Sequence, residues 1–100
     1  MVRHIILWKL KPELAGEEKE NVMQNAKRAL ESLAGVVPGL LKIEVQIQKL
    51  PSSNADMMLY TELENAEALA GYQKHPAHVA AANGFVRPFT AERVCMDFEA

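Results

Sequence analysis

The sequence lacks several features on which common classes of protein depend. Only Cys95 is a cysteine, so no disulfide can form within the chain, and a reducing, cytoplasmic setting is expected. Cys95 itself is expected in mid-strand as a buried structural thiol. No apolar run reaches the ~18 residues that a membrane-spanning helix needs. The formal net charge is −2 and the basic residues form no cluster, so nucleic acid is not an expected partner.

Motifs that carry familiar chemistry are also missing. There is no Gly-rich phosphate loop, and Ser52 and Ser53 stand outside any nucleophile-elbow context. His75 and His78 have a spacing that can place two metal ligands on one helix face, but Pro76 lies between them. No third ligand follows at a metal-binding spacing. The sequence therefore predicts no metal site and no cofactor.

The amino-acid composition is typical of a globular protein. Apolar residues make up 49% of the chain and charged residues 24%, which argues against disorder. A length of 100 residues predicts one domain over residues 1–100. Because a domain of this size has a small core, this apolar content is a first indication of a partner subunit.

The first half of the chain predicts two strands and one helix. A strand is expected over residues 2–10, and its middle, residues 5–8, is apolar on both faces. A helix with one apolar stripe is expected over residues 16–33, with Gly35 as its C-terminal cap. Residues 41–48 alternate between apolar and polar, which is typical of a half-buried strand. Its expected buried face consists of Leu41, Ile43, Val45 and Ile47.

The second half predicts two more strands around a broken helical region. A strand over residues 56–63 is expected to pair with the preceding one as a hairpin. A helix over residues 65–72 is expected to begin at Asn65 as its cap. Pro76 interrupts this helix and suits the first position of a new one that continues to about residue 84. The last strand, residues 90–99, carries one apolar face, formed by Val94, Met96 and Phe98.

This β-α-β-β-α-β order predicts an α+β fold of the ferredoxin-like type, with a four-stranded antiparallel sheet. Helices in this fold cover only one face of the sheet. Because the first strand is apolar on both faces, a second copy of the sheet is expected to cover the other face. The sequence therefore predicts a homodimer.

Three segments resemble a known family. The opening strand with His4, the segment Tyr72-Gln-Lys-His-Pro-Ala-His-Val79, and the last strand with Asp97 are similar to the stress-responsive α/β-barrel (Dabb) family. The resemblance covers nearly the whole chain and implies a dimeric ferredoxin-like barrel. Some members of that family are stress-induced proteins without a clear catalytic role, and others are polyketide cyclases that close an aromatic ring by aldol condensation. Some hold magnesium near the dimer interface, a site that this sequence does not by itself predict.

The resemblance also implies candidate catalytic residues. His78 matches the general base of the cyclases, Tyr72 the tyrosine that assists it, and His4 the histidine of the first strand. His78 would be the third residue of the helix that Pro76 opens, where the helix dipole disfavours an imidazolium. A neutral imidazole can accept a proton from an activated carbon acid. The alternative is structural: His75 caps the helix, His78 packs on the sheet and His4 is a hydrogen-bonded core residue.

Three functions remain open at this point. The first is a homodimer that binds a small apolar molecule in a pocket near His78. The second is a cofactor-independent, polyketide cyclase-like enzyme acting on an enolisable carbonyl compound. The third is a monooxygenase of the related antibiotic-biosynthesis type, which no motif here supports. A cavity that touches both His78 and Tyr72 would favour the enzyme, and a side chain that fills this space would exclude it.

Overall fold

The computed structural model describes all 100 residues, Met1–Ala100. The elements follow one another in the order that the sequence predicts, with the second helical region divided in two. They are β1 (Val2–Leu10), α1 (Gly16–Glu31), β2 (Leu40–Gln46), β3 (Met57–Leu63), α2 (Ala66–Lys74), α3 (Pro76–Phe85), a short 3-10 helix η1 (Arg87–Phe89) and β4 (Thr90–Glu99). No helix is long and apolar enough to cross a membrane.

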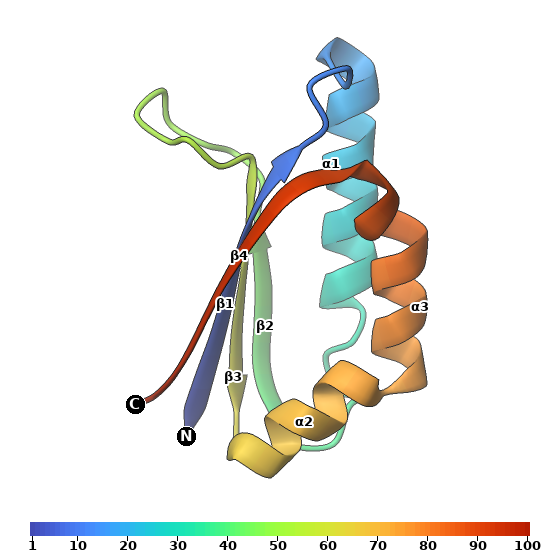
Figure 1. Ribbon diagram of the computed structural model, residues 1–100. Coiled ribbons are helices and arrows are strands. Elements are labelled where there is room, and N and C mark those ends of the chain that lie inside the picture. Colours follow the sequence, from blue (N-terminus) through green and yellow to red (C-terminus); the bar gives the residue numbers. More distant parts are fainter.

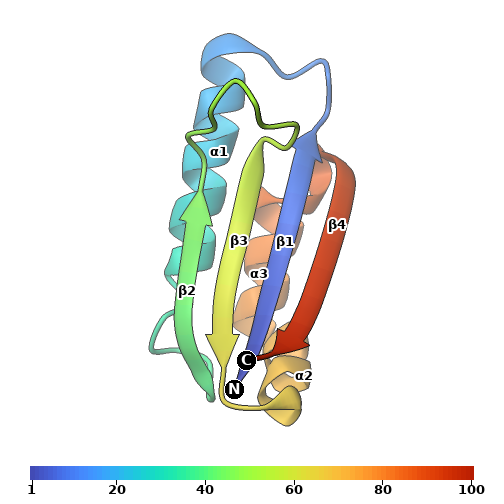
Figure 2. The ribbon, with the colours of Figure 1, turned by 90° about the vertical axis from the view of Figure 1, so that its left-hand side faces the viewer.

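The four strands form one sheet in the order β2-β3-β1-β4 (Figure 2). All three neighbouring pairs are antiparallel. This is the ferredoxin-like arrangement, so the predicted fold class is confirmed. Strand β1 is central, paired with β3 on one edge and β4 on the other, so its residues on the helical face are well covered.

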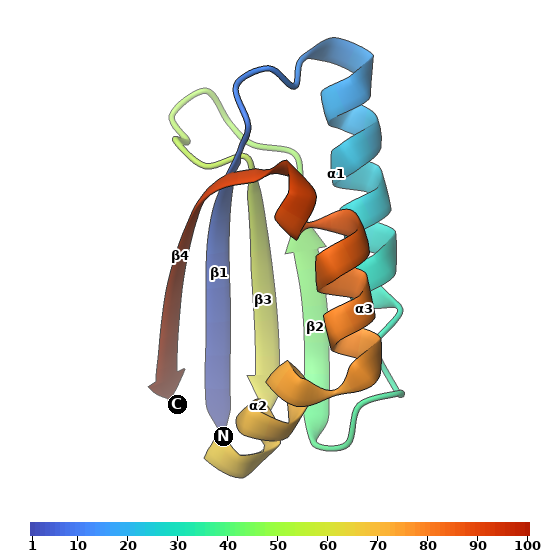
Figure 3. The ribbon, with the colours of Figure 1, turned by 45° about the vertical axis from the view of Figure 1, so that its right-hand side comes forward.

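The helices lie on one face of this sheet and leave the other face bare (Figure 1). Alternate residues of β1 belong to the two faces: Ile6 and Trp8 are buried under the helices at 4% exposure each, whereas Leu7 is 40% exposed. Helix α1 lies behind β2 and α3 behind β3 and β1 (Figure 2), and β4 forms the edge of the sheet farthest from α1 (Figure 3). The helical face of β4 is therefore largely open, and all its residues from Ala91 to Asp97 are exposed.

Two details of the sequence prediction are wrong. Helix α1 ends at Glu31, before the turn that contains Gly35, and not at residue 33. Leu41 was expected on the buried face of β2 but is 54% exposed. The register of β2 against β3 shifts between Leu40 and Lys42, and such an irregularity turns a side chain out of the alternation.

The bare face of the sheet carries an apolar surface, called here the open-face patch. Val94 and Met96 of β4 are 64% and 66% exposed within this surface. They alternate with residues that face the helices, as the prediction of one apolar face for this strand requires. Pairing of the strands places further apolar side chains beside them. The patch consists of Ile5, Leu7, Met58, Val94, Met96 and Phe98.

Candidate functional site

The break between α2 and α3 is built by the residues that the sequence singles out. The Asn65 side chain caps α2 by accepting a hydrogen bond from the Ala68 N–H at 2.8 Å. His75 is extended, with φ −61° and ψ 132°, as expected for a residue before proline. Its Nδ1 accepts from the Ala77 N–H at 3.1 Å and so caps α3, which begins at Pro76. The predicted capping role of His75 is confirmed.

This break brings together the three residues predicted as a site. The rings of Tyr72 and His78 have their centroids 4.5 Å apart, and those of His4 and Tyr72 lie 6.0 Å apart in an edge-on arrangement. Tyr72 is fully buried and His4 is 1% exposed, whereas His78 is half-buried. The side chains thus form a row from β1 through α2 to α3. Their catalytic roles remain predictions.

Asp97 extends this row and was not among the predicted site residues. Its carboxylate is hydrogen-bonded to Nδ1 of His4 across the β1–β4 pair. The Thr61 hydroxyl donates to the His4 carbonyl at 2.7 Å, so His4 is held from both sides. A signal for Asp97 was present in the sequence. If Val94, Met96 and Phe98 share one face of the last strand, Asp97 must point to the other face, toward the helices.

Cys95 is exposed, so the prediction of a buried structural thiol is wrong. The reason is the edge position of β4, beyond the cover of the helices. The thiol lies 3.6 Å from Nδ1 of His4 and 3.4 Å from the Asp97 carboxylate. Its partial burial and the hydrogen bond to Asp97 raise its pKa, so the neutral thiol is favoured.

His4, Cys95 and Asp97 are also the one group of three donors close enough to share a metal ion. Their nitrogen, sulfur and oxygen atoms would suit a transition metal. Such an ion would have to separate His4 from Asp97, because tetrahedral ligands stand farther apart than hydrogen-bonded atoms. The absence of a metal and of any cofactor stays a prediction from the sequence.

A cavity of about 250 Å³ opens beside His78, between the sheet and the segment from α3 to β4. It touches neither Tyr72 nor His4. Its apolar floor consists of Ile6, Trp8, Leu30, Leu59, Ala82 and Val86. Its polar part consists of His78, Arg87, Thr90 and Arg93. The two arginines are contributions that the sequence analysis did not identify.

The pKa of His78 is lowered, which is the direction that the sequence predicts. The sequence analysis attributed this to the helix dipole, but the main cause is a different one. Burial is the largest cause, and the positive charges of Arg87 and Arg93 act in the same direction. A backbone hydrogen bond at Gln73 opposes them. Nδ1 of His78 is buried and has no hydrogen-bond partner. The ring is therefore neutral near pH 7, and its Nδ1 is shielded from solvent.

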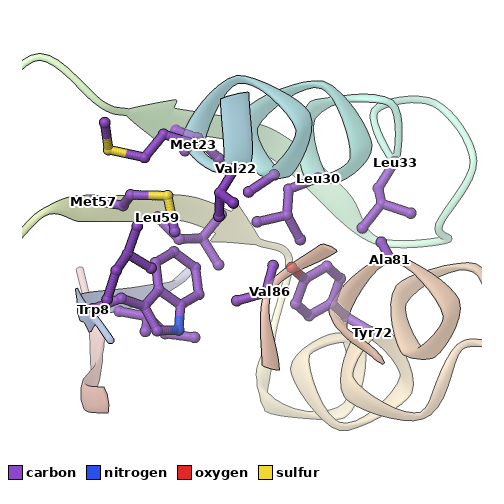
Figure 4. Packing of buried hydrophobic residues seen from close by; sticks show 14 of the residues in the cluster. Trp8, Val22, Met23, Leu30, Leu33, Met57, Leu59, Tyr72, Ala81 and Val86 are labelled. Atoms are coloured by element: carbon purple, nitrogen blue, oxygen red, sulfur yellow. The ribbon is translucent and has the colours of Figure 1, made fainter. Parts of the chain in front are cut away.

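The Tyr72 hydroxyl is a second buried polar group without a partner. It points into the core toward Val86 (Figure 4). Burial raises its pKa, so it stays protonated. A polar group left without a hydrogen bond costs about 1–3 kcal/mol. A cavity that touches both His78 and Tyr72 would favour an enzyme. This cavity is lined by His78 but not by Tyr72, so it supports a catalytic role only in part.

Comparison with known proteins identifies the family. The model of the stress responsive A/B barrel domain (Dabb) matches residues 2–100. The chain belongs to this family. The resemblance seen in the three sequence segments is thereby confirmed, and the Dabb domain spans all the elements described above.

Similar solved structures agree with the fold of this chain. A dimeric protein of unknown function from Bacteroides fragilis is 35% identical, with a TM-score of 0.92, over 99% of this chain and 95% of that one. A dimeric ferredoxin-like protein of unknown function from Thermobifida fusca is 27% identical, with a TM-score of 0.79, over 99% and 90%.

More distant likenesses show the fold alone. A hydroxynitrile lyase from Passiflora edulis is 14% identical, with a TM-score of 0.72, over 97% of this chain and 90% of that one. Comparison with curated proteins gives no match. The function of this Dabb domain must therefore be argued from its own site.

A second hollow, called here the outer groove, lies between α1 and α3. It is larger, at about 520 Å³, and contains Ala80 and Phe85. Its lining includes no histidine and no acidic residue, and Arg28 is its one charged side chain. A ligand site with acid–base chemistry is therefore better placed at the cavity beside His78.

The lowered pKa of His78 predicts a pH dependence. Above pH 6.5 the ring is neutral in both the folded and the unfolded chain. Below this value the unfolded chain takes up the proton first, so the free energy of unfolding should fall as the pH falls. NMR titration of the three histidine rings, with His78→Gln to assign the signal, should give His78 a midpoint below 6.5. A midpoint at or above that value would contradict the neutral ring.

Proposed function

We propose that this Dabb domain is a homodimer that binds a small apolar molecule in the cavity beside His78. The observation that carries the proposal is the apolar floor around Trp8 with the neutral His78 ring at its side. Binding sites of this kind are apolar, with a few polar groups that orient the ligand. At about 250 Å³ the cavity is smaller than most such sites, so the ligand is small.

The homodimer follows from the open-face patch. Exposed apolar side chains on a bare sheet face are favourably removed from water by another apolar surface. A second copy of the chain is the occupant that we propose, because the 35% identical relative from Bacteroides fragilis is described as dimeric. The relative from Thermobifida fusca is described in the same way. The cytoplasmic setting remains a prediction that rests on the single cysteine.

The second candidate function is proton abstraction with His78 as the base. The neutral His78 ring beside the cavity favours this role. Tyr72, the proposed assistant, is separated from the cavity, and His4 is bound to Asp97. We therefore place binding ahead of cyclase-like catalysis on a polyketide-like substrate. No residue of the cavity favours the monooxygenase alternative.

A titration with 1-octanol, a small apolar probe, tests the proposal. We expect NMR chemical-shift changes at the Trp8 indole and the His78 ring, since both line the cavity. The signals of Ala80 and Phe85 in the outer groove serve as an internal reference. Changes confined to those two residues, or no changes at all, would overturn the proposed site.

A further inference from the structure

We infer that the natural ligand of the cavity beside His78 carries a carboxylate or similar anionic group, held by Arg87 and Arg93, on an apolar body. The inference rests on the proposed function and adds the charge of the ligand. Both arginines line the cavity next to Thr90, on the side where α3 gives way to β4. The apolar floor supplies most of the remaining lining. The cavity is thus amphipathic, with one cationic end.

Neither arginine is neutralised within the chain. No acidic residue lines the cavity, and neither Arg87 nor Arg93 forms an ion pair. The one side-chain hydrogen bond of Arg87 goes to Asn83, a neutral group. Two guanidinium groups therefore stand beside one apolar cavity without a counter-charge.

Several lysines of this chain are, in contrast, paired with acidic residues. Lys19 and Lys49 both bind the carboxylate of Asp56, each at 2.9 Å. Lys27 binds Glu31 at 2.8 Å. Unpaired surface cations are common, but these two converge on one cavity. Their charges both reach the His78 ring, where they help to lower its pKa.

The chemistry of the guanidinium group defines the ligand. Its planar donors match a carboxylate with two parallel hydrogen bonds, and Arg binds such groups better than Lys does. The partial enclosure by Trp8 and Val86 excludes some water, which strengthens the attraction. The hydroxyl of Thr90, which donates to the Val86 carbonyl, can still accept a hydrogen bond from the ligand. A carboxylic acid with a short alkyl or aromatic body fits all these features.

The test compares octanoate with 1-octanol, which have chains of the same length and differ in charge. We expect octanoate to bind at least 10-fold more tightly at low ionic strength, measured by NMR titration at pH 7. In Arg87→Gln and Arg93→Gln this preference should fall at least 3-fold each. Arg28→Gln, in the outer groove, is the matched control and should keep the full preference.

The outcomes separate the inference from the proposed function. If 1-octanol binds at Trp8 and His78 but octanoate binds no more tightly, the ligand needs no anionic group and the inference is wrong. The inference is also wrong if Arg87→Gln and Arg93→Gln keep the preference for octanoate. In both cases the apolar binding site is retained. If neither probe reaches the cavity, the proposed function itself is wrong. A second readout is the His78 ring, whose pKa should rise when octanoate is bound, because an anion nearby favours the imidazolium. Neutral 1-octanol should give no such rise.

Discussion

Replacing Val94 by lysine should convert the proposed dimer into monomers. Val94 is 64% exposed in the single chain, so lysine is tolerated there without damage to the core. In a symmetric dimer each substitution occurs twice. Loss of the valine surface at two copies of this position removes about 2 kcal/mol of association free energy, which corresponds to about 30-fold weaker dimerisation. The cost of burying two ammonium groups adds to this value.

Sedimentation equilibrium over a range of concentrations measures this effect, and Val36→Lys is its control. Val36 has a similar exposure of 52% but lies in the turn after α1, away from the open-face patch. The control should remain dimeric. Equal dissociation constants for Val94→Lys and the unmodified protein would show that this face is not the interface between the two copies.

Replacing Ala82 by phenylalanine should abolish the binding of 1-octanol, with an affinity loss of at least 10-fold. Ala82 lies on α3, is 7% exposed and lines the cavity beside His78. A phenyl ring at this position would occupy the space of the ligand and pack against the apolar floor. Because the ring enters an existing cavity, the thermal unfolding midpoint should change little, whereas a fully packed core resists added volume.

Ala80→Phe is the matched control for this prediction. It introduces the same side chain on the same helix, but at an exposed residue of the outer groove. Calorimetric titration of both variants should show normal binding by Ala80→Phe and none by Ala82→Phe. Loss of binding in Ala80→Phe but not in Ala82→Phe would place the ligand in the outer groove. Unchanged binding in both variants would exclude both the outer groove and the cavity beside His78 as the ligand site.

The fold was predictable because local signals agreed with one another. Alternation in β4, the Asn65 cap and the Pro76 helix start each limit the local backbone, and together they leave one order of elements. The resemblance supplied Tyr72, His78 and His4, and the helix break explains why the first two lie side by side. These features depend on residues close in the chain, which sequence patterns describe well.

The remaining features depend on which elements meet in space. The exposure of Cys95 follows from the edge position of β4, and the exposure of Leu41 from a register shift. The cationic end of the cavity joins Arg87 and Arg93 across the start of a strand, and periodicity alone does not show that they share one cavity. The separation of Tyr72 from the cavity is likewise a result of packing.

A crystal structure of the protein with 1-octanol tests the central claim most directly. The account predicts two copies joined through the open-face patch, with the alkyl chain in each cavity against Trp8 and close to His78. An alkyl chain in the outer groove, with the cavity beside His78 empty, would contradict it.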